Sequence, residues 1–315
     1  MEKVAWVFPG QGSQYLGMGR DVAEAVPETK AYLDTASAIL GYDLATLCWD
    51  GPEDQLRQTQ YTQPALLTVS AMLIHVLRSQ GLRPQVVAGH SLGEYPALFA
   101  AGSLSFPDGI RLVERRGKLM EEAVPQGQGS MAVLLGLDHE HIVAICTEAA
   151  QGEVLELANL NSRDQIVISG ARTAVERAMA MGQKQGARRV LELAVSGPFH
   201  SSLMRPAAGL FADHLHTVHW DQPQVPFIAN VTADYVTDVA SIKELLTEQL
   251  YKPVRWDETI RRLVSDGIET FVEVGPGKVL TGLIKRISRK SNVVNLQEMQ
   301  GLEKVLEMTK GDIVI

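Results

Sequence analysis

The sequence contains little cysteine, with only Cys48 and Cys146 among its 315 residues. The two lie far apart and match no C-x-x-C spacing, which argues against a disulfide framework and against a cysteine-based metal or redox motif. Two isolated thiols in a long chain are typical of a reducing compartment. We therefore predict a cytoplasmic protein and expect neither a metal ion nor a cofactor.

Long hydrophobic runs and an excess of positive charge are also missing. The N-terminal apolar run, 4–9, is too short for a secretory signal, and no stretch approaches the ~18 apolar residues of a membrane span. Acidic residues outnumber basic ones by 37 to 29, which argues against nucleic acid and anionic membranes as partners. The hydrophobic share of 45% is enough for a substantial core, so we expect a globular chain that acts as a monomer.

Short apolar runs alternate with longer helical patterns over much of the chain. The runs 4–8, 86–89 and 270–275 each end at glycine or proline and are typical of buried strands. The segments 65–81 and 106–124 have the pattern of helices. This alternation predicts an α/β fold with a parallel sheet covered on both faces.

The middle of the chain follows a different order. Strand patterns at 129–138, 154–170 and 188–197 are separated by helical patterns near 139–151 and 171–186. The order β-α-β-β-α-β over about 70 residues is ferredoxin-like. We predict a discontinuous large α/β domain, 1–127 and 198–315, with a small ferredoxin-like subdomain, 128–197, inserted into it.

The stretch "VVAGHSLGEYPALFAAG" places Ser91 in a G-x-S-x-G turn between a strand and a helix. This is the context of a nucleophile elbow, in which a tight turn lifts the serine oxygen clear of the sheet. Gly89 and Gly93 are expected to be required because side chains there would collide where strand and helix cross. The alternative is a serine in an ordinary strand-to-helix turn.

A serine nucleophile needs a base, and His200 in "VSGPFHSSLMRP" is the best candidate. It follows a predicted strand, and the preceding Gly-Pro pair restricts the path of the chain. His75 lies in an apolar helix and is expected to be part of the core. The sequence "HLHTVH", with His214, His216 and His219, suggests zinc, but no carboxylate or thiolate cluster accompanies it, so we interpret it as a solvated helix end.

The glycine-rich stretch "FPGQGSQYLGMG" follows the first strand. A dinucleotide motif fails because Tyr15 occupies the last glycine position, and Walker A fails because Met18 follows Gly17. The backbone near Gln11 could instead supply an oxyanion donor. A nucleotide site is therefore not indicated.

An arginine pair, Arg115 and Arg116, stands before a glycine in "LVERRGKLM". In isolation the pair could be part of a solvated helix face. Alternatively, one guanidinium could grip a carboxylate through two parallel hydrogen bonds.

Seven motifs in order along the chain resemble the malonyl-CoA:acyl-carrier-protein transacylase family. They are "FPGQGSQ", "GHSLGE", the "RG" after the following helix, "NSRDQIVISG", "GPFHS", "EQLYKPVRW" and "EVGPGKVL". They extend from residue 8 to 280, nearly the whole chain. The resemblance implies the same fold, an α/β hydrolase-like domain with a ferredoxin-like insert.

The resemblance also implies a ping-pong mechanism. Ser91, activated by His200, takes the malonyl group from malonyl-CoA and passes it to the phosphopantetheine thiol of an acyl carrier protein. The main-chain oxygen at Gln249 would orient the histidine in place of a carboxylate. We infer that this weaker base spares the ester from water yet serves for a thiol, which ionises more readily.

Further roles follow from the matched positions. The backbone N–H groups of Gln11 and Leu92 would form the oxyanion hole. Arg116, directly before the glycine, would hold the malonate carboxylate, with Arg115 the less favoured of the two. Phe199 before the histidine would favour malonyl over methylmalonyl groups by filling the space of an α-methyl group.

The resemblance also assigns residues to the binding of coenzyme A or the carrier. The matching positions are Asn161, Arg188 and Arg189. An acidic carrier would need a local basic patch on this acidic chain. Arg188 and Arg189 could provide it, and so could a C-terminal group of five: Lys278, Lys285, Arg286, Arg289 and Lys290.

Three other functions remain open at this point. A free-standing malonyl acyltransferase of a polyketide synthase would use the same chemistry with another carrier. An editing acyl hydrolase would transfer short acyl groups to water, although a buried Arg116 disfavours ordinary fatty esters. A scaffold without activity would have no need of Ser91, His200 and Arg116 together.

Overall fold

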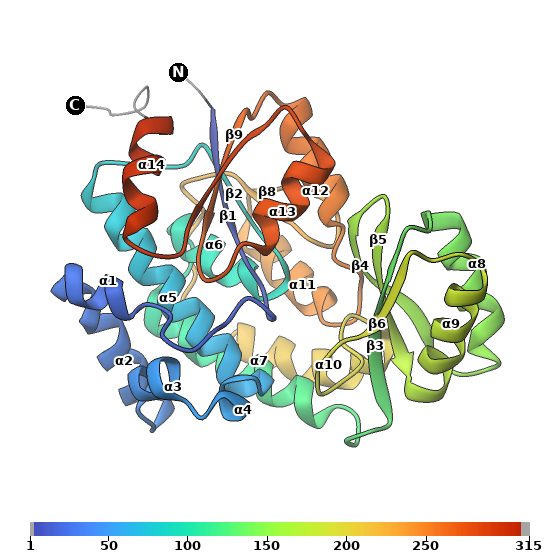
Figure 1. Ribbon diagram of the computed structural model, residues 1–315. Coiled ribbons are helices and arrows are strands. Elements are labelled where there is room, and N and C mark those ends of the chain that lie inside the picture. The colour runs from blue at the N-terminus through green and yellow to red at the C-terminus, as the bar shows by residue number, and fades with distance from the viewer. Residues whose placement is uncertain (1–2, 310–315) are drawn as a thin grey trace.

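The computed structural model describes residues 3–309 and contains two sheets (Figure 1). The larger sheet has six strands in the order β10-β9-β1-β2-β7-β8. All neighbours pair in parallel except β7 and β8, which are antiparallel. Its strands are β1 Val4–Phe8, β2 Val86–Gly89, β7 Phe227–Ala229, β8 Asp234–Val236, β9 Thr270–Val274 and β10 Asn292–Leu296.

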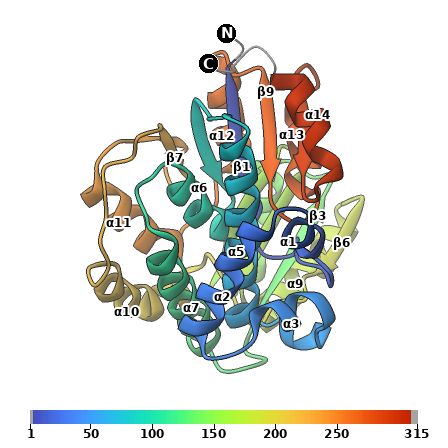
Figure 2. The same ribbon diagram turned by 90° about the vertical axis from the view of Figure 1, so that its left-hand side faces the viewer.

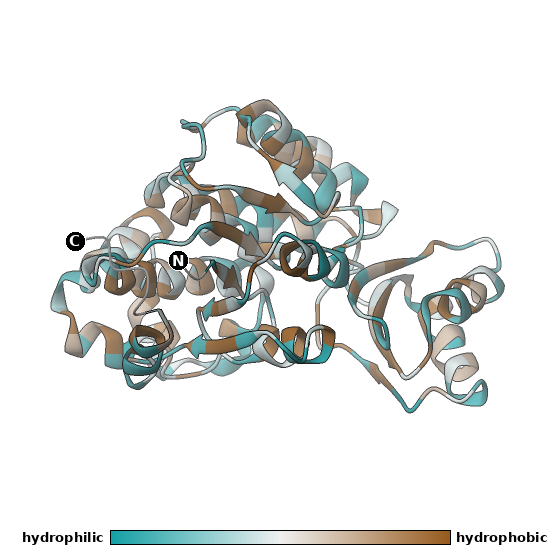
Figure 3. Ribbon diagram, turned by 90° about the horizontal axis from the view of Figure 1, so that it is seen from above, coloured by the Kyte–Doolittle hydropathy of each residue, from teal (hydrophilic) through white to brown (hydrophobic). Residues whose placement is uncertain are grey.

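Helices cover both faces of this sheet, as the alternating pattern predicts. Val4, Trp6 and Phe8 of β1 join one core cluster, whereas Ala5 and Val7 between them join a second cluster on the opposite face. Seen from above, the strands form a largely apolar band between the helices (Figure 3). The sheet is thus buried on both sides, as parallel sheets require.

The helices that build these layers come from both halves of the chain. On one face α2, α5 and α7 pack against one another (Figure 2), and on the other lie α12 and α13. The helices outside the small sheet are α1 Arg20–Ala25, α2 Lys30–Leu40, α3 Leu44–Asp50, α4 Glu53–Leu56, α5 Thr59–Ser79, α6 Glu94–Ala100, α7 Phe106–Glu122, α10 Arg205–Leu215, α11 Val239–Gln249, α12 Trp256–Ser265, α13 Val279–Ile287 and α14 Gln300–Thr309.

The smaller sheet is antiparallel and has the strand order β4-β5-β3-β6. In chain order its elements are β3 Gly129–Leu135, α8 His139–Ala150, β4 Leu155–Ser162, β5 Gln165–Ala171, α9 Arg172–Lys184 and β6 Arg189–Glu192. This is the ferredoxin-like arrangement, set to one side of the larger sheet (Figure 1). All six elements fall within 128–197, while the exact domain boundaries stay a prediction.

One expected segment differs from the structure, and another agrees with it. The helix expected at 65–81 is α5, which begins at Thr59 and ends at Ser79. Its first turn is polar in sequence, yet Thr59, Thr62 and Gln63 are buried, so the apolar pattern missed this start. The segment 154–170 contains the two strands that the predicted β-α-β-β-α-β order requires, paired as an antiparallel hairpin.

Cys48 and Cys146 are buried and free. From residue 3 to residue 309, no helix combines the length and apolarity needed to cross a membrane.

Candidate active site

Ser91 stands at the turn between β2 and α6, with a positive φ of 52°. Such a φ is strained for a residue with a side chain and is found at nucleophile elbows. The two flanking glycines allow the turn. A Cβ on Gly89 would lie 1.9 Å from the carbonyl carbon of Gly93, and a Cβ on Gly93 would lie 2.0 Å from the oxygen of Phe8. The predicted need for both glycines is confirmed.

His200 lies across from the serine, 109 positions later in the chain. Its Nε2 is 2.8 Å from Ser91 Oγ, and its Nδ1 is 2.7 Å from the main-chain oxygen of Gln249. The backbone N–H of His200 donates to Leu250 O at 3.0 Å, so the ring and its backbone are both held by the end of α11. Since Nδ1 faces a carbonyl acceptor, it carries the proton and leaves Nε2 free to accept one.

The electrostatic environment keeps this imidazole neutral. Burial, followed by the positive charge of Arg116, lowers the pKa of His200 to about 3. The hydrogen bond to Gln249 O acts in the opposite direction but does not outweigh them. A neutral imidazole is the form that can take a proton from a serine.

Arg116 on α7 reaches the same point. Its Nη2 lies 3.1 Å from Ser91 Oγ and 2.7 Å from Gln249 Oε1, and its Cζ lies 5.7 Å from the centre of the Tyr95 ring. The residue is 1% exposed, and no carboxylate between residues 3 and 309 is ion-paired with it. Its Nε is buried without a hydrogen-bond partner in that range. A buried cation with unused donors is expensive unless an anion joins it.

Arg115, the other member of the pair, points elsewhere. Its Nε donates to His214 Nε2 at 2.9 Å, on the α10 side of α7. Gly117 lets α7 approach α5, since a Cβ there would lie 2.7 Å from the Cα of Gln60. The structure thus brings Arg116, and not Arg115, to the serine.

A buried polar network lies behind these three side chains. Gln249 Nε2 donates to Ser91 O at 2.9 Å and to a carboxylate oxygen of Glu94. Asn230 Oδ1 accepts from the Ser91 N–H at 2.7 Å, and the Asn230 N–H donates to Glu94 Oε1 at 2.6 Å. Burial raises the pKa of Glu94 to about 8, although the Asn230 hydrogen bond and Arg116 oppose that rise.

The serine, histidine and arginine open onto one cavity of about 80 Å³. Gln11, Leu92 and Phe199 also line it, so six of the residues singled out from the sequence share one site. The side chain of Gln11 donates to Thr59 Oγ1 at 3.1 Å, which explains in part why the first turn of α5 is polar and buried. The remaining lining residues are His90, Met120, Met131, Asn159, Leu193 and Val195.

Other predicted site residues lie outside this cavity lining. Asn161 Oδ1 contacts His90 Nε2 at 2.8 Å and so supports the residue before the nucleophile. Arg188 and Arg189 are exposed at the edge of the smaller sheet, where Arg188 is 3.2 Å from an oxygen of Asp164.

The zinc interpretation of "HLHTVH" finds no support among residues 3–309. In that range no group of three or more histidine, cysteine, aspartate or glutamate side chains is placed to hold a metal ion. His214 instead contacts Arg115, and His219 pairs with Asp221 at the surface.

Sequence reasoning missed Glu94 and Asn230 as parts of the site. Glu94 belongs to the quoted "GHSLGE", and an acidic residue in an otherwise apolar helix was a usable signal. Asn230 follows β7 in "FIANVT", with no nearby motif to mark it. Its contacts with Ser91 and Glu94 span more than 130 residues of sequence.

Comparison with known proteins places this geometry in a family. The acyl transferase domain matches residues 5–306. The chain belongs to the acyl transferase family. It is 44% identical over 313 residues to the malonyl CoA-acyl carrier protein transacylase of Bacillus subtilis, covering 99% of both chains.

Solved structures of acyl transferases agree closely with the fold described above. An acyl carrier protein S-malonyltransferase from Vibrio cholerae superposes with a TM-score of 0.94 at 48% identity, covering 96% of this chain and all of the other. A malonyl-transacylase solved in complex with a type II polyketide synthase acyl-carrier protein gives a TM-score of 0.95 at 46% identity, with 98% and 100% covered.

Proposed function

We propose that this acyl transferase moves a malonyl group from malonyl-CoA to the phosphopantetheine thiol of an acyl carrier protein. The observation that carries the proposal is Arg116, a buried guanidinium beside the nucleophile with no ion-pair partner among the described residues. A second carboxylate on the acyl group would supply the missing anion. The relatives with malonyl-transfer names support the same substrate.

The first half-reaction forms a malonyl-serine ester. His200 Nε2 takes the hydroxyl proton of Ser91 as the oxygen attacks the thioester carbonyl. Gln11 and Leu92 line the cavity beside Ser91, and their backbone N–H groups hold the tetrahedral oxyanion. The oxyanion then collapses, the carbon–sulfur bond breaks, and the coenzyme A sulfur leaves with the proton from His200.

The second half-reaction reverses these roles with another thiol. The carrier thiol gives its proton to His200, the sulfur attacks the serine ester, and Ser91 recovers its proton as the oxygen leaves. Because His200 Nδ1 faces the neutral Gln249 carbonyl, the imidazolium gains less stabilisation than a carboxylate would give. Such a base is strong enough to take a proton from a thiol but too weak to activate water, so the serine ester is not hydrolysed.

The size of the cavity favours a small acyl group. Phe199 is 5% exposed and lines the cavity with Met120 and Met131, and these bulky side chains take up space that an α-methyl group would need. Malonyl is therefore the preferred substrate over methylmalonyl.

The same proposal includes domain boundaries at 127/128 and 197/198 and a monomeric state. It also includes a cytoplasmic location, which the two buried free thiols support.

We assign the pathway to fatty-acid synthesis, with polyketide synthesis as the second candidate. The solved complex of a similar malonyl-transacylase with a polyketide synthase carrier favours keeping this alternative. The chemistry at Ser91 is the same in both cases, and only the carrier differs. Transfer rates measured with carriers of the two kinds would separate them.

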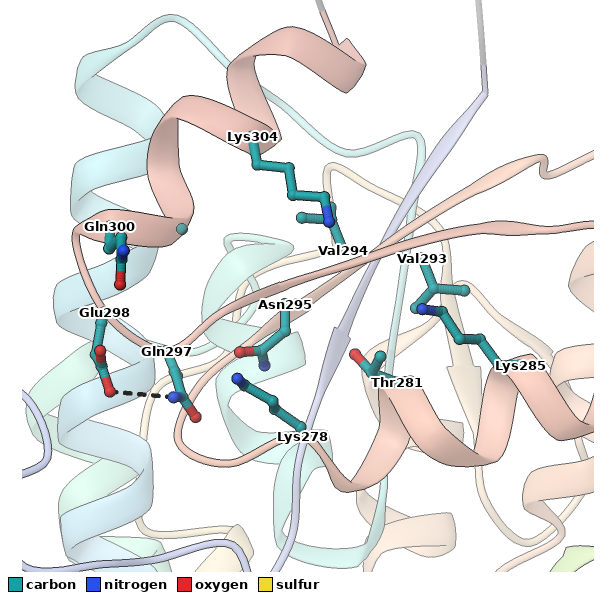
Figure 4. A pocket seen from close by; sticks show the side chains of 11 residues that line it. Lys278, Thr281, Lys285, Val293, Val294, Asn295, Gln297, Glu298, Gln300 and Lys304 are labelled. Atoms are coloured by element: carbon teal, nitrogen blue, oxygen red, sulfur yellow. Dashed lines mark hydrogen bonds between the residues drawn. The ribbon is translucent and has the colours of Figure 1, made fainter.

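The two basic stretches considered for the carrier meet on one surface. Arg188 contacts Asp164, and Arg286 Nη1 donates to Gln165 Oε1 at 2.9 Å, so both approach the turn between β4 and β5. Lys278, Lys285 and Lys304 surround a neighbouring pocket of about 310 Å³ between α13, β10 and α14 (Figure 4). We propose that an acidic carrier protein docks on this combined basic surface.

Intact-protein mass spectrometry tests the proposed function. Incubation with malonyl-CoA without a carrier should add one malonyl mass to the protein, and Ser91→Ala should abolish the adduct. Addition of a carrier should then discharge the wild-type adduct. A persisting adduct in Ser91→Ala would refute the nucleophile assignment.

A further inference from the structure

Gln249 contributes to the site twice, once through its backbone and once through its side chain. Its carbonyl orients His200, while its amide touches Arg116, Ser91 and Glu94. The amide is completely buried, so water cannot substitute for a lost partner. The orientation of this one amide therefore affects both the base and the guanidinium.

The partners of the amide define one orientation. Its nitrogen faces three acceptors: Ser91 O, a carboxylate oxygen of Glu94 and, at 3.5 Å, Asn230 Oδ1. Its oxygen faces a donor, Nη2 of Arg116. If the amide turned over, its NH₂ group would face the guanidinium, and two donors would oppose each other.

Glu94 is the group that makes this orientation unambiguous. One of its carboxylate oxygens accepts from the Asn230 N–H and the other accepts from Gln249 Nε2. Each oxygen of Glu94 is therefore used as an acceptor, which matches the two donors that face it. Glu94 is 1% exposed, lies outside the cavity lining and is hydrogen-bonded to Asn230 and Gln249.

We propose that Glu94 is a positioning residue that determines acyl-group selectivity, by fixing the Gln249 amide and through it the guanidinium of Arg116. This inference rests on the proposed function, because it concerns the residue assigned to the malonyl carboxylate. It adds a determinant on α6, one turn from the nucleophile, that never touches substrate.

Glu94→Gln is the most informative variant because glutamine has nearly the same shape as glutamate. The Asn230 N–H requires an acceptor, so the oxygen of the new amide would face Asn230 and its NH₂ would face Gln249. Gln249 would then have to turn its own NH₂ away from that group and toward Arg116. The guanidinium would lose its acceptor next to Ser91.

The measurement is single-turnover formation of the acyl adduct by mass spectrometry, with malonyl-CoA and acetyl-CoA in parallel. We expect Glu94→Gln to lower the malonyl-to-acetyl rate ratio on the order of 10- to 100-fold, mainly through weaker malonyl-CoA binding. Acetyl transfer should change far less, because it does not use Arg116 as a carboxylate clamp. An unchanged ratio in a folded Glu94→Gln protein would overturn the inference.

Glu273 provides a matched control. It is also fully buried, and its carboxylate accepts from the N–H groups of Leu280 and Thr281 at the start of α13, away from the serine. Glu273→Gln should lower the melting temperature but leave the malonyl-to-acetyl ratio intact. An equal drop in the ratio for Glu273→Gln would mean that any buried carboxylate has this effect, and would also overturn the inference.

A second variant covers the case in which Glu94→Gln does not fold. Gln249→Met removes the amide but keeps the carbonyl that orients His200, so it should lower the ratio similarly, and a retained ratio would contradict the inference. If both single variants fold, the malonyl-to-acetyl ratio of the double variant should be no lower than that of Gln249→Met alone. Failure of the proposed function would look different, since the unaltered protein would then form no malonyl adduct.

Discussion

Arg116 Nη2 lies 3.1 Å from Ser91 Oγ, so the buried cation and the nucleophile touch directly. In a malonyl thioester the carboxylate carbon is two bonds from the thioester carbonyl carbon. A clamp this close to the nucleophile can therefore select the acyl group while it reacts. Ser91 lies in the turn that precedes α6, and Arg116 lies in the middle of α7.

Arg116→Ala is expected to separate dicarboxylic from simple acyl groups. Removing one partner of a buried charged contact should lower kcat/KM for malonyl-CoA by about 100- to 1,000-fold. The loss with acetyl-CoA should be much smaller, or replaced by a gain. Parallel kinetics with both substrates check this, with Arg115→Ala as the control because that side chain points toward His214. Equal losses with both substrates would show that Arg116 is not the clamp.

The rate of serine acylation should be unusually resistant to acid. Since the folded-state pKa of His200 is lowered to about 3, the imidazole stays neutral well below the ordinary 6.5. Acylation should therefore remain nearly constant from about pH 7 to about pH 5 and fall only as the pH approaches the lowered value. A pH profile of adduct formation measures this. A fall centred near 6.5 would contradict it.

The same shift makes a prediction about stability. Below pH 6.5 the unfolded chain protonates this histidine while the folded chain does not, so the contribution of His200 to stability is lost as the pH falls toward about 3. His200→Gln should reduce this acid sensitivity. Urea denaturation of both proteins across that pH range provides the test, and identical pH slopes would refute the assignment.

Phe199→Ser should admit a branched acyl group. Removing the ring frees space in the cavity lined by Met120 and Met131. The ratio of kcat/KM for methylmalonyl-CoA to that for malonyl-CoA should rise by about 10- to 100-fold. Competition between the two thioesters measures it, and an unchanged ratio would refute the steric argument.

The basic surface should affect the carrier half-reaction alone. Replacing Arg188 and Arg286 together with alanine should lower kcat/KM for the carrier by about 10-fold and weaken its salt dependence. Acylation by malonyl-CoA should stay unchanged. Replacing Arg57, at the C-terminal end of α4, and Arg111 of α7 together with alanine removes two exposed positive charges and is the charge-matched control. A similar loss in both half-reactions would argue against a docking role.

Much of the fold could be predicted because its signals are local. The strand at 4–8 matches β1 residue for residue, since an apolar run ending at proline has few alternatives. The tight turn at Ser91 follows from glycine sterics, which depend on a few adjacent residues and the strand beside them. The histidine at position 200 was recognisable from its loop and from the family motif.

The sequence by itself determined which chemical groups this protein has: a serine in a turn that few residues can make, a histidine after a Gly-Pro pair, and an arginine before a glycine. Tertiary structure decided which of them meet. The choice of Arg116 at the serine, the union of two basic stretches at the β4–β5 turn and the Glu94–Gln249 contact all join residues far apart in the chain. Side-chain contacts of this kind depend on packing between distant elements, which no local pattern encodes.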